Sequence, residues 1–172
     1  MYINITIKNT RILINDKLGG QLMKWSLKKF SELTNDEIYK ILKLRNEIFI
    51  VEQSCPYMDC DGKDEESYHL FAEDGENIIA YLRIIKKGII YDDTAIGRVC
   101  VNKKYRKNNL GKEMLLKAIS FIENELNEKK IKIQAQSYLY DFYKNLGFNK
   151  ISDNYLEDGI SHIDMIYNKK VK

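Results

Sequence analysis

Apolar residues recur every three to four positions in two long stretches of the chain, which is the spacing of an amphipathic helix. The first stretch predicts a helix over about residues 36–50, and Thr34 and Glu37 have the spacing of a capping box. The second predicts a helix over about residues 109–127, and a third, shorter helix is expected at 140–146. The inner face of the second helix is formed by Leu110, Met114, Leu115, Ala118, Ile122 and Leu126.

Shorter runs of aliphatic, β-branched and aromatic residues predict strands between these helices. They are expected at residues 24–29, 68–72, 78–85, 96–101, 131–135, 148–155 and 162–167, with a short continuation at 89–91. Asp74-Gly75 is a strong turn pair that joins the second strand to the third. The strand–helix–strand order at the centre implies one parallel pair, while the other strands can pair antiparallel. One α/β domain with a mixed sheet is therefore expected over residues 23–172.

The first 22 residues allow two interpretations. Residues 2–7 and 11–14 alternate apolar and polar side chains, which is typical of a hairpin whose exposed edge would join a sheet. Alternatively, the abundance of Lys, Asn and Ile indicates an AT-rich genome, in which Gly19-Gly20 would be encoded by a purine-rich ribosome-binding sequence. Met23 would then be the native start and residues 1–22 a translated leader. N-terminal sequencing of the natively expressed protein distinguishes the two.

Composition and charge argue against several classes of protein. The 28 basic and 25 acidic residues leave a formal net charge of +3, too small and too scattered to favour nucleic-acid binding. No apolar stretch reaches the roughly 18 residues that cross a bilayer, and no signal-peptide pattern opens the chain. Cys55, Cys60 and Cys100 are an odd number without metal-ligand spacing, which indicates reduced thiols in a cytoplasmic protein.

Two strand-to-helix junctions carry most of the candidate chemistry. In the first, the strand Ile-Gly-Arg-Val-Cys-Val at 96–101 leads to Arg106-Lys107-Asn108-Asn109-Leu110-Gly111 at the start of the long helix. Backbone N–H groups and the dipole at a helix start favour anions, so this loop predicts a phosphate site. In the second, the strand at 131–135 leads to a short helix with Phe142-Tyr143, followed by Gly147-Phe148.

Together these segments resemble the GCN5-related N-acetyltransferase (GNAT) family. The acetyl-CoA signature of that family is Gln or Arg, two residues, Gly, one residue, then Gly or Ala. Arg106 and Gly111 match it, and Asn109 replaces the middle glycine. Asn is the non-glycine residue that most readily adopts a positive φ, so the loop is expected to keep its shape.

A closer resemblance, over most of residues 23–167, is to the ElaA-type branch of this family. It implies the acyl-CoA N-acyltransferase fold, with a mostly antiparallel sheet, one central parallel pair and helices on both faces. It also implies transfer of an acetyl group from acetyl-CoA to a primary amine, on a small molecule or a peptide, by direct attack in a ternary complex. The motifs that carry it are Val-Glu-Gln-Ser-Cys-Pro-Tyr at 51–57, Asp-Cys-Asp-Gly at 59–62, Ile-Gly-Arg-Val at 96–99, Phe142-Tyr143 with Gly147-Phe148, and Glu-Asp-Gly-Ile at 157–160 with His162.

The resemblance assigns expected roles to particular residues. Tyr143 would be the general acid that protonates the departing thiolate, although a core aromatic is the alternative reading. Glu52, His69 and His162 are the candidates for the general base, and either histidine could instead be structural. The expected acetyl-CoA contacts are backbone groups of Val99, Cys100 and Val101, the loop Arg106, Lys107, Asn108, Asn109, Leu110, Gly111 and Lys112, and the side chains of Gln136 and Phe142.

Other readings of the same residues stay open. Because Asn109 departs from the signature and no base is unique, a non-catalytic acyl-CoA-binding module is the alternative function. Cys100 lies in a strand without a Cys–His motif, so a buried structural thiol is expected. The acids between 59 and 66 lack the spacing of a calcium loop, since Tyr57 and Tyr68 would take its first and last positions. They are either an acidic rim for a cationic amine or a solvated loop: Asp59, Asp61, Asp64, Glu65 and Glu66.

Overall fold

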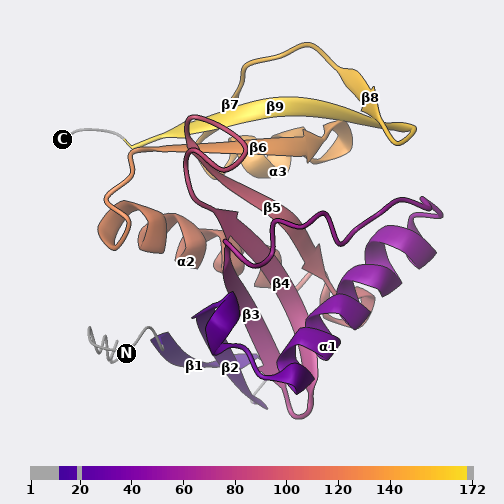
Figure 1. Ribbon diagram of the computed structural model, residues 1–172, viewed down its shortest axis with the longest axis vertical. Helices are drawn as coiled ribbons and strands as arrows, with labels where there is room; N and C mark the ends of the chain where they lie inside the picture. The colour runs from indigo at the N-terminus through magenta and orange to yellow at the C-terminus, as the bar shows by residue number, and fades with distance from the viewer. Residues whose placement is uncertain (1–11, 19–20, 170–172) are drawn as a thin grey trace.

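A mixed sheet runs through the computed structural model, which describes residues 12–18 and 21–169 (Figure 1). Its strands follow the order β1-β2-β3-β4-β5-β6-β9-β7, and β8 pairs with β9. β5 and β6 run parallel, and the other described pairs are antiparallel, so the predicted mixed sheet with one central parallel pair is confirmed. The strands are β1 (Ile12–Leu18), β2 (Gln21–Lys29), β3 (Tyr68–Asp74), β4 (Asn77–Ile85), β5 (Thr94–Val101), β6 (Lys130–Gln136), β7 (Phe148–Lys150), β8 (Tyr155–Glu157) and β9 (Ile160–Asn168).

Helices cover both faces of the sheet (Figure 1). On one face, Ile41, Leu44 and Ile48 pack against Phe71 and Tyr81. On the other face, α2 and α3 bury a larger apolar core over β2 to β6 and β9. The helices are α1 (Asn35–Arg45), the π-helical η2 (Asn46–Glu52) that continues it, α2 (Leu110–Asn124), α3 (Tyr140–Lys144) and the short turns η1 (Phe30–Glu32), η3 (Lys103–Tyr105) and η4 (Ser137–Leu139).

The predicted start of the first helix is confirmed, the strand predicted at 89–91 is wrong, and the one predicted at 148–155 is right only at its two ends. Thr34 Oγ1 accepts from the Glu37 N–H, and a Glu37 carboxylate oxygen accepts from the Thr34 N–H. The continuation at 89–91 is a turn, because Gly88 has a φ of +83° and leaves the extended conformation. The strand expected at 148–155 is broken, since Ser152 Oγ accepts from the Asp164 N–H where a backbone carbonyl would continue the ladder.

At the N-terminal edge, β1 pairs antiparallel with β2 and extends the sheet. The predicted hairpin placed its two arms at 2–7 and 11–14, and residues 2–7 lie outside the described residues. In the described part, the second arm runs on to Leu18 and pairs with β2, which begins three residues earlier than predicted. A start of the native chain at Met23 stays a prediction.

A bulge in β5 shapes the centre of the sheet. Arg83 of β4 pairs with Gly97, and Tyr81 pairs with Cys100, so three steps along β5 face two steps along β4. Arg98 takes up the extra residue with a φ of +52°. A bulge bends the strand that carries it and increases the local twist. We expect such a bend to turn the second half of β5 away from its neighbour on the other side, since the bulge follows the residues that pair with β6.

β5 and β6 separate as a result. Their parallel register covers the pairs Thr94–Ile131 and Ala95–Lys132, at the start of both strands. Beyond these pairs β6 continues beside β9, while β5 continues beside β4. The facing edges of β5 and β6 therefore present backbone N–H and C=O groups that the sheet itself does not pair.

Candidate active site

A cleft of about 960 Å³ opens where β5 and β6 separate. The two strands, the start of α2, α3, the end of η2 and the turn between β8 and β9 form its walls. Asn108 and His69 do not line it. The other residues predicted for catalysis or donor binding do, and they are Glu52, Val99, Cys100, Val101, Arg106, Lys107, Asn109, Leu110, Gly111, Lys112, Gln136, Phe142, Tyr143 and His162.

The loop before α2 has the backbone conformation of an anion site. Lys107 and Asn109 both have positive φ, +68° and +59°, so the expectation that Asn109 supports a left-handed conformation is confirmed. Asn109 is the N-cap of α2, and the Glu113 N–H donates to its carbonyl at 3.0 Å. The N–H groups before Glu113 have no partner within the helix and face the end where its dipole is positive. Lys107 and Lys112 add two cationic side chains to the cleft.

Arg106 and Glu52 form an ion pair at the edge of the cleft. The Arg106 Nη1 and Nη2 donate to the two carboxylate oxygens of Glu52 at 2.6 and 3.0 Å. Its Nε donates to the Val101 carbonyl at 2.9 Å, which fixes the guanidinium beside β5. The hydrogen bond with Arg106 lowers the pKa of Glu52, so the carboxylate in this arrangement is a weaker base than a free glutamate.

Gln136 and Gln53 join the end of β6 to the end of η2. The Gln136 Nε2 donates to Gln53 Oε1 at 3.1 Å, and the Gln53 Nε2 lies 3.5 Å from Gln136 Oε1. The amide that was expected to bond the donor therefore has a partner within the chain. The sequence did not reveal this contact, because the two residues lie 83 positions apart, although Gln53 belongs to the motif at 51–57.

Tyr143 lies in the wall of the cleft with its ring in the core. The residue is 5% exposed, and its ring packs edge-on against Phe142 and Phe148, with ring centroids 5.1 and 5.8 Å away. Burial raises the pKa of Tyr143, so its phenol stays protonated at neutral pH. Among the described residues, none accepts or donates a hydrogen bond at its hydroxyl group. The side chain is thus a core aromatic with a protonated hydroxyl group, in a residue that lines the cleft.

His162 faces the cleft from β9, directly across from Gln136 of β6. Its Nδ1 lies 2.9 Å from the Ile160 carbonyl, which can only accept, so Nδ1 carries the proton. In the neutral ring, Nε2 then holds the free lone pair, as a general base requires. The ring also stacks on Tyr155, with centroids 6.2 Å apart.

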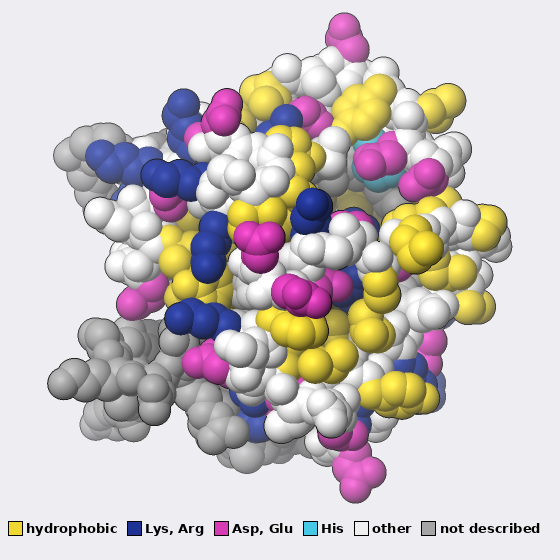
Figure 2. All heavy atoms as spheres, in the orientation of Figure 1, with side chains coloured by type: hydrophobic (Ala, Val, Ile, Leu, Met, Phe, Trp, Pro, Cys, Tyr) yellow, Lys and Arg dark blue, Asp and Glu magenta, His cyan; other side chains and the backbone are white. Residues whose placement is uncertain are grey.

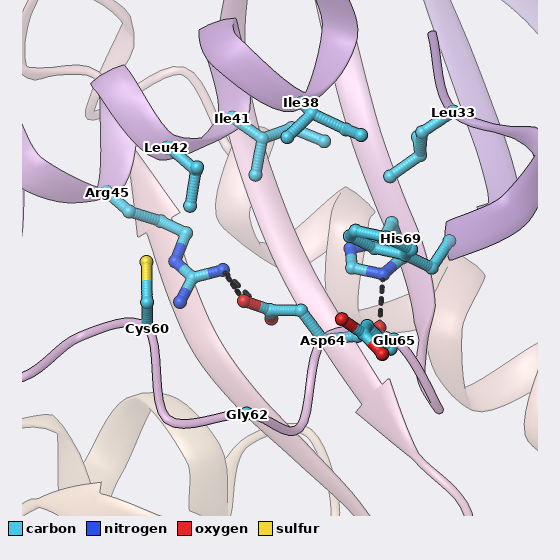
Figure 3. A pocket seen from close by; sticks show the side chains of 11 residues that line it. Leu33, Ile38, Ile41, Leu42, Arg45, Cys60, Gly62, Asp64, Glu65 and His69 are labelled. Carbon is cyan, nitrogen blue, oxygen red and sulfur yellow. Dashed lines mark hydrogen bonds and ion pairs between the residues drawn. The ribbon is translucent and has the colours of Figure 1, made fainter. Parts of the chain in front are cut away.

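The structure does not bring His69 to the cleft. It lies in a separate pocket of about 250 Å³ between α1 and the loop at 59–65 (Figure 3). Its Nε2 donates to the Asp64 carbonyl at 2.9 Å, and its Nδ1 lies 2.9 Å from the Tyr81 hydroxyl. Both ring nitrogens are thus engaged within the fold. We therefore assign His69 a structural role.

The acids between 59 and 66 fall into two groups. Glu65 and Glu66 are exposed, as a solvated loop requires, whereas the three aspartates form ion pairs within the fold. The side chains of Asp59, Asp61 and Asp64 pair with those of Arg45, Arg83 and Arg98; we call these six residues the arginine–aspartate network. Figure 3 shows one of its contacts, between Arg45 and Asp64. The sequence did not reveal the network because the arginines come from α1, β4 and β5 and meet the loop only in the folded chain.

The network gives an expectation for stability in acid. Burial lowers the pKa of His69 below 6.5, so an unfolded histidine binds a proton at a pH where His69 does not. Burial alone would raise the pKa of Asp61 from 3.8, but the hydrogen bond and charge of Arg83 prevail and lower it to about 2. In both cases the unfolded state binds more protons than the folded state does as the pH falls, so acid favours unfolding. We therefore expect the free energy of unfolding to decrease below about pH 6.5 and again between about pH 4 and 2.

Urea unfolding from pH 8 to pH 3 measures this dependence through the transition midpoint. In the variant His69→Gln, the urea midpoint should not fall below about pH 6.5 relative to its own value at pH 8. It should still fall below about pH 4, because Asp61 is unchanged. A midpoint in the unaltered protein that does not change between pH 7 and 5 would contradict the assignment of His69 as a buried neutral ring.

Comparison with known proteins places these features in a family. The family described as Acetyltransferase (GNAT) domain matches residues 32–169. Protein ElaA of Escherichia coli is 34% identical over 146 residues, which cover 84% of this chain and 95% of ElaA. Its crystal structure is similar with a TM-score of 0.79 at 33% identity, covering 84% of this chain and 99% of that chain.

Two further solved structures share the fold. An acyl-CoA N-acyltransferase from Pseudomonas aeruginosa has a TM-score of 0.81 at 34% identity, covering 84% of this chain and 99% of the other. PaiA N-acetyltransferase from Thermoplasma acidophilum, solved in complex with coenzyme A, has a TM-score of 0.61 at 14% identity. That likeness covers 84% of this chain and 98% of PaiA, and it concerns the fold alone.

Within residues 12–18 and 21–169, no helix is long and apolar enough to cross a membrane. The same residues contain no group of three or more His, Cys, Asp or Glu side chains arranged to hold a metal ion.

Proposed function

Because this chain belongs to the GNAT acetyltransferase family, whose fold supports acyl transfer from a CoA-linked donor, we propose that it transfers an acetyl group from acetyl-CoA to a primary amine. One observation carries the proposal. The gap between β5 and β6 and the start of α2, with its left-handed residues Lys107 and Asn109, line the same cleft. An anion site therefore lies next to an unpaired strand edge. A donor with a pyrophosphate and an extended amide-containing arm requires both.

The residues of the cleft fit such a donor. The N–H groups from Lys107 to Lys112 would hold the pyrophosphate, with charge from the two lysine side chains. The backbone of β5 from Val99 to Val101 would pair with the pantetheine arm, and an N–H group there would polarise the thioester carbonyl. Val99 and Val101 side chains pack against the larger core, so their contribution is structural.

Acyl transfer then needs two proton transfers and a neutral nucleophile. The amine nitrogen attacks the thioester carbon, a C–N bond forms, and the C–S bond breaks. His162 or Glu52 would accept the proton that the amine loses, and Tyr143 would give a proton to the leaving thiolate. Glu157 at the end of β8 and Asp158 in the turn that follows also line the cleft, and they form no ion pair with described residues. Their charge favours an acceptor that arrives as a cation, as an amine does at neutral pH.

The surface charges and the cysteines bear on the class of acceptor and on the cellular location. In Figure 2, Lys and Arg side chains alternate with Asp and Glu over the visible face, without a continuous basic surface. We therefore propose a small-molecule or peptide amine, and not a nucleic acid, as the acceptor. Cys55, Cys60 and Cys100 are free thiols, and burial raises the pKa of the Cys100 thiol to about 12, so it is no nucleophile. Free thiols fit the proposed cytoplasmic location.

Gly111 provides a test of donor binding that is separate from folding. A Cβ on Gly111 would lie 3.6 Å from Val101 and 3.8 Å from Phe142, which are ordinary contacts. Gly111→Ala should therefore fold, and its melting temperature should be unchanged or slightly higher because Ala favours helix by about 0.5–1 kcal/mol. The added methyl lies at the start of α2, where the pyrophosphate would approach. We expect CoA to bind about tenfold more weakly, as calorimetric titration would show. Unchanged affinity would contradict this placement of the pyrophosphate.

The proposed activity is tested by thiol release. Purified protein with acetyl-CoA is offered a panel of amines that includes diamines, amino acids and lysine-containing peptides. Release of free CoA that depends on one of these amines supports the proposal. Binding of CoA without release by any amine would favour the alternative function, a non-catalytic acyl-CoA-binding module.

A further inference from the structure

Two adjacent residues at the end of η2 reach both walls of the cleft. Glu52 pairs with Arg106 beside β5, at 2.6 and 3.0 Å. Gln53 pairs with Gln136 at the end of β6, with its carbonyl oxygen accepting at 3.1 Å. We call Glu52 and Gln53 the strap. It connects the two strands at the place where their own pairing has ended.

The strap occupies the side chains of Arg106 and Gln136, which the sequence analysis predicts as donor contacts. All three nitrogens of the Arg106 guanidinium are engaged, Nε by the Val101 carbonyl and the other two by Glu52. Both amide atoms of Gln136 face Gln53. Neither side chain can make a full set of contacts to a donor while it keeps its partner in the strap.

The contacts of the strap are of a kind that a ligand can replace. The Glu52 and Arg106 side chains are 35% and 37% exposed, so solvent screens their attraction. Two oxygens of a phosphate group offer Arg106 the same bidentate geometry as the Glu52 carboxylate, and a pyrophosphate carries more negative charge than one carboxylate. The Gln53–Gln136 contact joins two neutral amides, and an amide of an extended donor arm can take its place.

The strap is also anchored behind its two contacts. The Gln53 N–H donates to the Ile48 carbonyl, and the Cys55 N–H donates to the Ile50 carbonyl. Ser54 has a φ of +52°, and Cys55 Sγ contacts the Asp158 carbonyl of the β8–β9 turn. The side-chain contacts of Glu52 and Gln53 can therefore break while the backbone hydrogen bonds of this segment remain.

We propose that the strap is a latch that the donor opens: the pyrophosphate takes Arg106 from Glu52, and the pantetheine arm takes Gln136 from Gln53. This inference rests on the proposed function. When the latch opens, Glu52 loses its contact with Arg106, the cation that lowers its pKa and makes it a weaker base. Glu52 lines the cleft in which the amine must lose its proton. The carboxylate is thus available after the donor has bound.

The variants Glu52→Gln and Gln53→Ala test the latch by calorimetric titration with CoA. If the strap competes with the donor, each variant should bind CoA about two- to fivefold more tightly, the range set by an exposed ion pair. Glu47→Gln is the matched control, because Glu47 lies on the same helix in an exposed pair with Lys43. It should bind CoA as the unaltered protein does.

The outcomes separate this inference from the proposed function. Weaker or unchanged CoA binding in both strap variants would overturn the latch, since the strap would then position Arg106 and Gln136 for the donor or have no effect on it. If the unaltered protein binds no CoA, the proposed function fails and the latch fails with it.

Discussion

Replacing Tyr143 with Phe should lower the rate of acetyl transfer by about 10²–10⁴-fold, the usual contribution of a general acid. The ring would keep its packing against Phe142 and Phe148, because only the hydroxyl group is removed. The melting temperature and the affinity for CoA should therefore stay close to those of the unaltered protein. Thiol release with the best amine measures the rate, and calorimetric titration measures the affinity.

Tyr140→Phe is the control for this substitution. Tyr140 lies on the same helix, outside the residues that line the cleft, and its ring contacts Lys144. That variant should transfer the acetyl group at the unaltered rate. If Tyr143→Phe also keeps the full rate, the thiolate takes its proton from another group, and Tyr143 is a core residue alone.

Replacing Arg45 with Met should lower the free energy of unfolding by about 3–5 kcal/mol, as expected for a broken buried ion pair. Arg45 is 0% exposed and donates from all three nitrogens, to the Asp59 carboxylate, the Asp59 carbonyl and the Asp64 carboxylate. Met fills much of the same volume but leaves these oxygens without one of their donors. Urea unfolding at pH 7 measures the change.

Lys43→Met provides the comparison from the same helix. Lys43 and Glu47 are half exposed and 4.0 Å apart, so losing this pair should cost less than about 0.5 kcal/mol. A loss below about 1 kcal/mol for Arg45→Met would show that the arginine–aspartate network adds little to stability. The loop that it holds includes Tyr57 and Asp61 in the wall of the cleft, so the network also fixes part of the proposed active site.

Local patterns in the sequence predicted most of the framework. The capping box at Thr34 depends on residues three positions apart, and the inner face of α2 depends on spacings of three and four. The left-handed Asn109 follows from the backbone preference of a single residue type. Each of these features is decided within one turn of chain, which is why the sequence reveals them.

Features that depend on distant residues could not be read in this way. Arg45 meets Asp59 and Asp64 across a loop, and Arg98 joins them from a bulge whose extra residue has no sequence signal. The three aspartates were therefore interpreted as solvated or substrate-facing, whereas they form ion pairs with arginines of three elements. Glu65 and Glu66 are exposed, as the solvated reading expects. The break at Ser152 has a similar cause, since its hydroxyl accepts from Asp164 of another strand.

The same limit applies to the proposed catalytic residues. The candidates for the base came from motifs, and their environments distinguish them. His69 has both ring nitrogens engaged in the fold, and Glu52 is paired with Arg106. His162 lines the cleft and has its Nδ1 engaged by the Ile160 carbonyl, which leaves Nε2 with the lone pair. While Glu52 is paired with Arg106, His162 is the most suitable general base of the three. If the donor breaks that ion pair, the Glu52 carboxylate can also act as the base.

Thermal unfolding with and without acetyl-CoA tests the central claim, a site for a CoA-linked donor in the cleft between β5 and β6. A ligand at about 100 times its dissociation constant adds about 2.7 kcal/mol, which raises the melting temperature of a protein of this size by about 5–10 °C. We expect such a shift with acetyl-CoA and with free CoA, and little shift with ATP. No shift at saturating acetyl-CoA, or an equal shift with ATP, would contradict this claim.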